Sequence, residues 1–388
     1  MRRTNSETPI PNPQHLLKNQ PPTSNPQPLV LLTPGPTPIP PSVLAKLAEP
    51  ILHHRTVEFG AFFERVIQDL QYVFRTKNTV LLQTTSGTGG MESAVANLLS
   101  PGDKTLVATA GAFGNRWGKI LKAYGFLPII QEEEWGSAID PNRFEALLKT
   151  HGKDLKAVYL THTETSTGVV HPIEVLSRLI HQYSDALVVV DSISGLGGQE
   201  LKTDEWNLDV VVSASQKGLM NAPGLAFISL SERALQVMEM SKCPRFYWDW
   251  RTMKKSVPNK ETPYTPSVSL VVAQAEALRL IKEEGIESVW AKTTRLAQWT
   301  REELKKLNFP LFPHPPCDVL TSVSVPESVN ATELVHRLLK DFRISIADGQ
   351  EKLKGRIIRI AHMGYIRKED LQRGFSALQT CLTDTQKK

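Results

Sequence analysis

The sequence predicts an α/β fold in which a mainly parallel, seven-stranded sheet lies between helices, followed by a smaller C-terminal α+β domain. Seven short apolar segments alternate with helical patterns between residues 30 and 284. Several of these segments are apolar at nearly every position, which is typical of strands buried on both faces of a sheet. Beyond Pro310 the pattern changes to strand, helix, strand, strand, helix. We therefore expect a large domain at 30–284 and a small domain at 285–388.

The elements of the large domain follow one another at short intervals. The predicted strands are Thr79–Gln83, Thr105–Ala108, Leu127–Gln131, Ala157–Thr161, Ala186–Asp191, Val210–Ala214 and Leu225–Leu230. The predicted helices are Glu92–Leu99, Phe113–Tyr124, Arg143–Lys149, Pro172–Tyr183 and Glu232–Met240. This alternation is typical of a doubly wound sheet.

Two longer helical patterns, Ser267–Glu284 and Glu287–Leu307, are separated near Gly285. The elements predicted after them are strand Leu320–Val325, helix Ala331–Lys340, strands Arg343–Ala347 and Arg356–Ala361, and helix Lys368–Leu382. Residues 1–29 are rich in Pro, Asn, Gln and Thr without a hydrophobic period, which predicts a flexible N-terminal arm.

Composition excludes several classes of function. The net charge of +5, from 45 basic and 40 acidic residues, gives no basic patch for a nucleic acid. No apolar run approaches the ~20 residues that a membrane span needs. Cys243, Cys317 and Cys381 are far apart, so no metal-ligand spacing is present, and their small number favours the reducing cytoplasm.

Two charged residues follow apolar strands at the place where open α/β sheets bind ligands. Asp191 closes the segment 186–191, and Lys217 follows the segment 209–216. One amine and one carboxylate, delivered by two core strands, suit pyridoxal phosphate (PLP). Lys217 would bind the cofactor covalently, and Asp191 would keep its pyridine nitrogen protonated. Taken alone, the pair could equally be a buried ion pair.

The stretch from Thr84 to Met91 is rich in Gly, Ser and Thr and precedes a predicted helix. Small residues let the backbone approach a ligand, and the free N–H groups of a helix start attract an anion. Thr88 adds a hydroxyl donor, so the stretch suits one phosphate group. Neither the Walker nor the dinucleotide-binding glycine spacing is present, and a simple turn remains the alternative.

Three other motifs carry polar or aromatic side chains of interest. The hydroxyl-rich run Thr161–Gly168 could reach a ring oxygen, or could form only a turn. Phe113 could stack on a flat ring, although a lone aromatic residue is more often in the core. Arg359 lies between isoleucines and could bind a substrate carboxylate or form a structural ion pair. Arg55 could bind an anion or belong to a helix cap.

Together these motifs resemble the class V aminotransferases, which are fold-type I PLP enzymes. The pattern is similar to the alanine–glyoxylate and serine–pyruvate group, and most of all to the cyanobacterial "soluble hydrogenase small subunit" type. The resemblance runs from Thr33 to the C-terminal helix. The matching motifs are His54–Phe59, Ser86–Gly89, Glu164–Val169, Ser215–Gly218, Tyr264–Pro266 and Arg359–Ile360.

The resemblance implies a role for each matching residue. Lys217 would carry the cofactor and move protons, and Asp191 would pair with the ring nitrogen. Phe113 would stack on the ring, and Thr165 would approach the ring oxygen. The residues implied for the phosphate are Thr88, Gly89, Gly90 and Gln216, with Tyr264 and Thr265 reaching the phosphate of the neighbouring subunit in a homodimer with shared sites. The residues implied for the substrate are Gly35, Arg55 and Arg359.

The implied reaction moves an amino group from serine or alanine to a 2-oxo acid such as glyoxylate or pyruvate. Arg55 keeps an aspartate- or phosphoserine-type aminotransferase open, because it could contact a second anionic group. A cysteine desulfurase is less well matched, because Gln216 stands where a histidine would precede the lysine and Cys317 lacks the setting of a nucleophile. A non-catalytic hydrogenase accessory subunit is the non-enzyme alternative.

Overall fold

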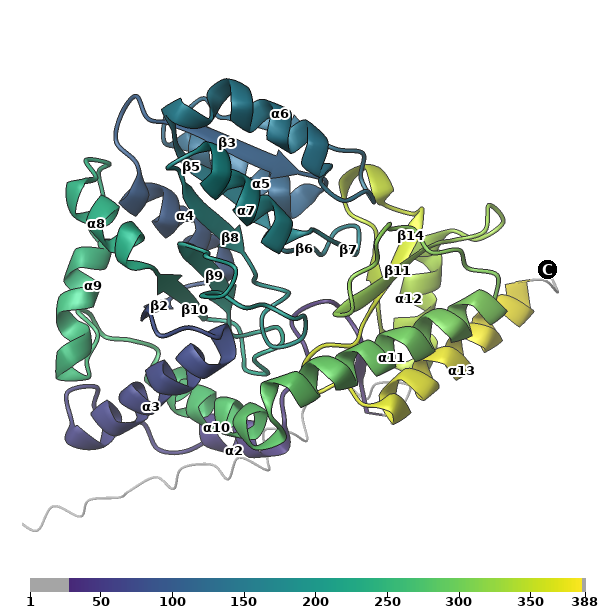
Figure 1. Ribbon diagram of the computed structural model, residues 1–388. Helices are drawn as coiled ribbons and strands as arrows, with labels where there is room; N and C mark the ends of the chain where they lie inside the picture. Colours follow the sequence, from purple (N-terminus) through teal and green to yellow (C-terminus); the bar gives the residue numbers. More distant parts are fainter. Residues whose placement is uncertain (1–27, 386–388) are drawn as a thin grey trace, which may run out of the picture.

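The computed structural model describes residues 28–385, so the predicted arm at 1–29 lies almost wholly outside the described residues (Figure 1). Its centre is a seven-stranded sheet in the order β2-β10-β9-β8-β5-β3-β4. The strands are β2 Thr79–Thr84, β3 Lys104–Thr109, β4 Ile129–Glu132, β5 Leu155–Thr161, β8 Leu187–Asp191, β9 Val210–Ala214 and β10 Leu225–Leu230. Only β10 runs antiparallel to its neighbours in this sheet. The predicted mainly parallel, seven-stranded sheet is confirmed.

Both faces of the sheet are buried, because successive residues of a strand enter two different hydrophobic cores. In β8, Val188 and Val190 contact one core, whereas Leu187 and Val189 contact the other. The first core contains α3 Val57–Phe74, α6 Pro141–His151, α7 Ile173–Tyr183 and α10 Val268–Glu284. The second contains α4 Gly87–Leu98, α5 Ala112–Ala123, α8 Glu232–Met240 and α9 Trp250–Ser256. This two-sided burial explains why the strands read as continuous apolar runs.

A separate hydrophobic core, which includes Val30 and Leu32, lies among the C-terminal elements, which stand beside the central sheet in Figure 1. Its elements are α11 Ile286–Lys306, β11 Leu320–Ser324, α12 Ala331–Phe342, β14 Ile357–Ala361 and α13 Lys368–Thr385. The predicted strand Arg343–Ala347 is instead two short strands, β12 Ile344–Ser345 and β13 Ala347–Asp348. They pair with different partners: β12 with β1 Val30–Leu31, and β13 with β14. We propose the domain boundary at Gly285, where α10 ends and α11 begins.

The sheet brings the ends of β5, β8 and β9 together at one edge. Thr161 ends β5, Asp191 ends β8, and Lys217 follows the end of β9 by three residues. Because these strands are parallel neighbours, the polar residues that follow them meet at the carboxyl edge of the sheet. Among the described residues, no helix is long and apolar enough to cross a membrane.

Candidate active site

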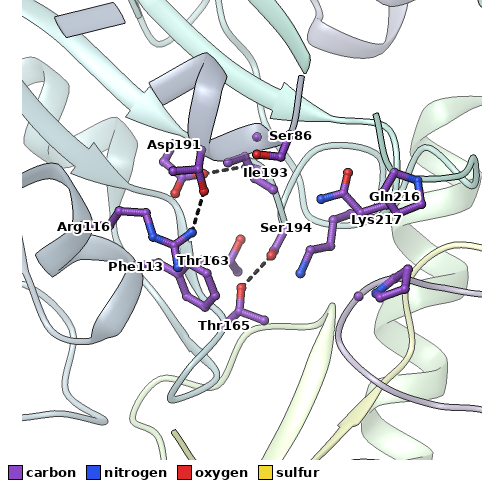
Figure 2. A pocket seen from close by; sticks show the side chains of 15 residues that line it. Ser86, Phe113, Arg116, Thr163, Thr165, Asp191, Ile193, Ser194, Gln216 and Lys217 are labelled. Atoms are coloured by element: carbon purple, nitrogen blue, oxygen red, sulfur yellow. Dashed lines mark hydrogen bonds between the residues drawn. The ribbon is translucent and has the colours of Figure 1, made fainter. Parts of the chain in front are cut away.

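A cavity of about 250 Å³ opens at this edge of the sheet (Figure 2). Seven residues singled out from the sequence line it: Gly35, Thr88, Phe113, Thr165, Asp191, Gln216 and Lys217. Other residues that line it, and that sequence reasoning did not assign, include Ser86, Arg116, Thr163, Ile193 and Ser194. The cavity therefore collects side chains from segments that are far apart in the sequence.

Asp191 is a buried carboxylate with one backbone partner. Its side chain is 4% exposed, and its Oδ1 accepts a hydrogen bond from the Ile193 N–H at 2.8 Å. Burial raises the pKa of Asp191 to about 7, against the lowering effects of the Ile193 hydrogen bond and of the Arg116 and Lys217 charges. A cation placed against this carboxylate in the cavity would restore its normal acidity.

Lys217 is a buried amine held against the N-terminal segment of the described chain. Its Nζ donates to the Pro34 carbonyl oxygen, and the Thr37 hydroxyl donates to the Lys217 carbonyl oxygen at 2.9 Å. Gly35 has a φ of +119°, and a Cβ built there would lie 2.5 Å from Nζ, so only glycine fits beside the amine. Burial lowers the pKa of Lys217 to about 8, although the nearby Asp191 charge raises it.

The first turn of α4 faces the same cavity through Thr88, its second residue. A helix start leaves backbone N–H groups without intrahelical partners, and these groups favour an anion. Gly90 lies on the other side of this turn, where an added Cβ would come within 2.9 Å of Val212 on the sheet. Gly90 thus lets the helix approach the sheet closely, while Gly89 is buried against Thr85 and Trp248.

The start of α5 positions Phe113, and a buried carboxylate holds it. Glu164 is fully buried and accepts backbone N–H bonds from Phe113 at 3.1 Å, Gly114 at 2.8 Å and Ser166 at 3.1 Å. Burial raises the pKa of Glu164, and these hydrogen bonds oppose the rise. His162, the neighbouring candidate for acid–base chemistry, is within 3.0 Å of the Ser192 hydroxyl and packs edge-on against Trp206. Glu164 therefore serves as a cap of α5 in this structure.

Two buried polar atoms at the cavity have no hydrogen-bond partner among the described residues: Thr163 Oγ1 and Gln216 Oε1. Thr165 differs, because its hydroxyl lies 2.5 Å from the Ser194 hydroxyl. Buried polar groups are nearly always hydrogen-bonded, so the two unpartnered atoms indicate a ligand or solvent in this space. Thr163 belongs to the hydroxyl-rich run noted in the sequence, whereas only the Asp191-x-x-Ser194 spacing could have indicated Ser194.

Arg359 lies next to the cavity but is not part of its lining. It is 5% exposed, and its guanidinium donates to the carbonyl oxygens of Thr165 at 2.9 Å and Asp348 at 2.6 and 3.0 Å. Three of the five N–H donors are thus used, and no carboxylate in residues 28–385 forms an ion pair with it. Burial lowers the pKa of Arg359 to about 10, while the Asp348 and Glu164 charges raise it.

Three predicted site residues lie elsewhere on this chain. Arg55 forms an ion pair with Glu261 and donates to the Thr262 carbonyl oxygen at 2.9 Å. Tyr264 and Thr265 line a different, small cavity. The structure therefore groups these three residues in one surface region, apart from Lys217.

The comparisons with known proteins agree with this geometry. The model of the family "Aminotransferase class-V" matches residues 29–373. The chain belongs to the class V aminotransferase family. A protein named soluble hydrogenase, small subunit, from Synechococcus sp. is 39% identical over 92% of this chain and 93% of its own length. A serine–glyoxylate aminotransferase from Methylorubrum extorquens is 33% identical over 91% of each chain.

A solved structure has the same fold as this chain. The alanine–glyoxylate aminotransferase from Nostoc sp. has a TM-score of 0.88 and 30% identity, covering 97% of this chain and 100% of that one. Class V aminotransferases are generally PLP-dependent transaminases. The predicted family and fold type are therefore confirmed.

Proposed function

We propose that the cavity binds PLP and that this class V aminotransferase transfers an amino group from serine or alanine to glyoxylate or pyruvate. The main observation behind the proposal is that Lys217 and Asp191 line one cavity beside the N-terminus of α4. The unpartnered Thr163 hydroxyl, the Gln216 side chain, whose amide N–H₂ can donate to a phosphate, and the buried Asp191 carboxylate fit a ligand with a phosphate, a ring oxygen and a basic ring nitrogen. PLP, when bound, supplies an aldehyde for the amine and a ring that accepts electrons.

Lys217 and Asp191 divide the chemistry between them. With a pKa of about 8, Lys217 is partly neutral near pH 7, so its amine could hold the aldehyde of the cofactor and could hold or move a proton at the substrate carbon. Asp191 stabilises positive charge on the ring nitrogen, because its own burial is compensated only by a nearby cation. Neither residue can replace the other in these roles.

The remaining residues bind and orient. We assign the phosphate to Thr88, Gly89, Gly90 and Gln216, the ring face to Phe113 and the ring oxygen to Thr165. Arg359 keeps two N–H donors free, which suits a bidentate bond to the α-carboxylate of an amino acid. Arg359 is fixed to the Thr165 carbonyl oxygen, so the site for the carboxylate and the site for the ring are joined directly.

The active form is proposed to be a homodimer with shared sites. Thr265 is exposed, and Tyr264 stacks on Tyr247 with a centroid separation of 5.5 Å. Phe246 lies beside them and is 79% exposed. An exposed aromatic group of this kind favours a contact with a second copy, in which Tyr264 and Thr265 reach its phosphate site. We place the protein in the cytoplasm, where its three buried cysteines would stay reduced.

The size of the cavity supports a small amino acid as the donor of the amino group. Its volume of about 250 Å³ within one chain is below the ~300–1,000 Å³ of ordinary ligand pockets, which favours a donor with a short side chain. Ultraviolet–visible spectra of the purified protein with Ser, Ala, Asp and Glu would test this. We expect loss of the cofactor's yellow colour with Ser and Ala. A bleach only with Asp or Glu would instead support the aspartate-type alternative left open by Arg55.

Lys217→Ala tests the assigned chemistry. Removal of the amine leaves no group to bind the aldehyde or carry the proton, so turnover should fall by at least about 10⁴-fold. The measurement is transamination with serine and glyoxylate, with Lys202→Ala on the surface as a matched control. Full activity in Lys217→Ala would contradict the proposal.

The similarity to a hydrogenase subunit favours testing an accessory role as a second candidate. Borohydride treatment separates the two roles, because it fixes PLP covalently on Lys217 and the labelled peptide can be identified by mass spectrometry. Purified protein that is colourless, unlabelled and bound to a hydrogenase would support the accessory role.

A further inference from the structure

Arg116 directs a positive charge into the cavity without a carboxylate partner. It lies on α5 and lines the cavity next to Phe113 (Figure 2). Its Nη1 donates to Thr88 Oγ1 at 2.8 Å, and its Cζ lies 4.6 Å from the centroid of the Phe113 ring. In the described part of the chain, no carboxylate forms an ion pair with Arg116, and Thr88 is its sole hydrogen-bond partner.

Most of the N–H donors of the Arg116 guanidinium are free to bind a ligand. Arginine carries five N–H donors in a rigid fork, and Arg116 uses one of them within the described chain. Its charge also lowers the pKa values of both Asp191 and Lys217, so it acts electrostatically on the whole cavity. A cavity that contains two cationic side chains and one carboxylate suits a ligand with more than one negative charge.

The contact with Thr88 indicates where that negative charge lies. Because Arg116 donates to Thr88 Oγ1, the hydroxyl hydrogen of Thr88 stays free to donate to a ligand. A hydroxyl that accepts a charged hydrogen bond is also a stronger donor. Gly87 and Thr88 begin α4, where the first N–H groups have no intrahelical partner, and both residues line the cavity. Backbone N–H groups, a hydroxyl and a guanidinium therefore form one set of donors.

We propose that Arg116 binds the phosphate of the cofactor, directly and through the Thr88 hydroxyl, and thereby selects the phosphorylated over the unphosphorylated form. This inference rests on the proposed function, because it assigns a further residue to the same site. A phosphate dianion accepts several charge-assisted hydrogen bonds at once, which a neutral hydroxymethyl group does not. The selectivity should therefore depend on the charge and the fork of Arg116.

Equilibrium binding of PLP and of pyridoxal to the cofactor-free full-length protein tests the proposal, with quenching of tryptophan fluorescence as the readout. We expect Arg116→Met to weaken PLP binding by about 10- to 100-fold and pyridoxal binding by less than about threefold. Lys119→Met removes an exposed cation one turn further along α5 and should change neither affinity. Equal losses for the two ligands, or no loss for either, would overturn the role of Arg116.

Thr88→Val provides an independent check in case Arg116→Met folds poorly. This variant should lose PLP affinity selectively, and the double variant should lose less than the product of the two single losses, because both act on one phosphate. If the affinity loss of the double variant equalled the product of the two single losses, Arg116 would not act through the Thr88 hydroxyl. Wild-type protein that binds neither ligand would overturn the proposed function as well, whereas tight binding with no selectivity change overturns only this inference.

Discussion

At the scale of single residues, Asp191 combines a functional position with a cost to stability. The folded chain raises its pKa to about 7 from the ordinary 3.8, so the folded state holds a proton that the unfolded state releases between these values. Stability of the cofactor-free protein is therefore lost as pH rises from about 4 to 7, and the loss is complete above that range. The carboxylate is kept despite this cost because only a charged oxygen can stabilise a cationic ring nitrogen.

Asp191→Asn should make the cofactor-free protein more stable and the enzyme inactive. We expect a gain of about 2–4 kcal/mol at pH 8 and none below pH 4, because the neutral amide has no charge to bury. Urea unfolding at several pH values measures this gain. Asp209→Asn is the matched control, since Asp209 is equally buried but accepts bonds from the Val188 N–H and the Ser231 hydroxyl, and it should lose stability. A pH-independent effect of Asp191→Asn would contradict the argument.

At the scale of elements, the position of α5 depends on Glu164. Glu164→Gln would turn an amide N–H₂ toward backbone N–H groups that now donate to the carboxylate, so donors would face donors. We expect a loss of about 2–4 kcal/mol in folding stability, together with altered circular dichroism of the bound cofactor, because Phe113 shifts with the helix. Glu145→Gln on the surface of α6 should leave both measurements unchanged. Equal effects of the two variants would show that the cap is unimportant.

The sequence predicted the elements that carry strong patterns and missed those that depend on context. Strands such as β8 were found because both faces are buried, so they are apolar throughout. The short strands β12 and β13 were merged, because their partners come from distant parts of the chain. The helix α3 is an exception: it was not predicted, although its buried residues recur at helical spacing. Within the site, Lys217 and Asp191 follow strands and were found. Arg116 was missed, because nothing in a sequence shows that a helical arginine points inward.

At the scale of the whole molecule, the separation of Tyr264 and Thr265 from Lys217 leads to a complementation experiment. In a dimer with shared sites, mixing Lys217→Ala with a Tyr264→Ala/Thr265→Ala double variant gives heterodimers that hold one intact site. Refolding an equal mixture should restore roughly a quarter of wild-type activity, although each variant alone is nearly inactive. If each site were built from one chain, mixing would restore no activity. A mixture of the Lys217→Ala protein with the Thr262→Ala protein, refolded in the same way, provides a control for the mixing procedure.

The segment from Val30 to Leu47 links three parts of the molecule in series. It pairs with β12 in the C-terminal part, contacts Lys217 through Pro34 and Thr37, and ends in α2 Pro41–Leu47, which packs on α10. If the C-terminal part moved as a rigid body, it would therefore displace the same segment that contacts the Lys217 amine. A bond between the amine and a ligand would change the contact with Pro34, whereas the bond from the Thr37 hydroxyl to the Lys217 carbonyl oxygen does not involve the amine. We therefore expect a displacement of the C-terminal part and the bonding state of the Lys217 amine to influence each other through the Pro34 contact.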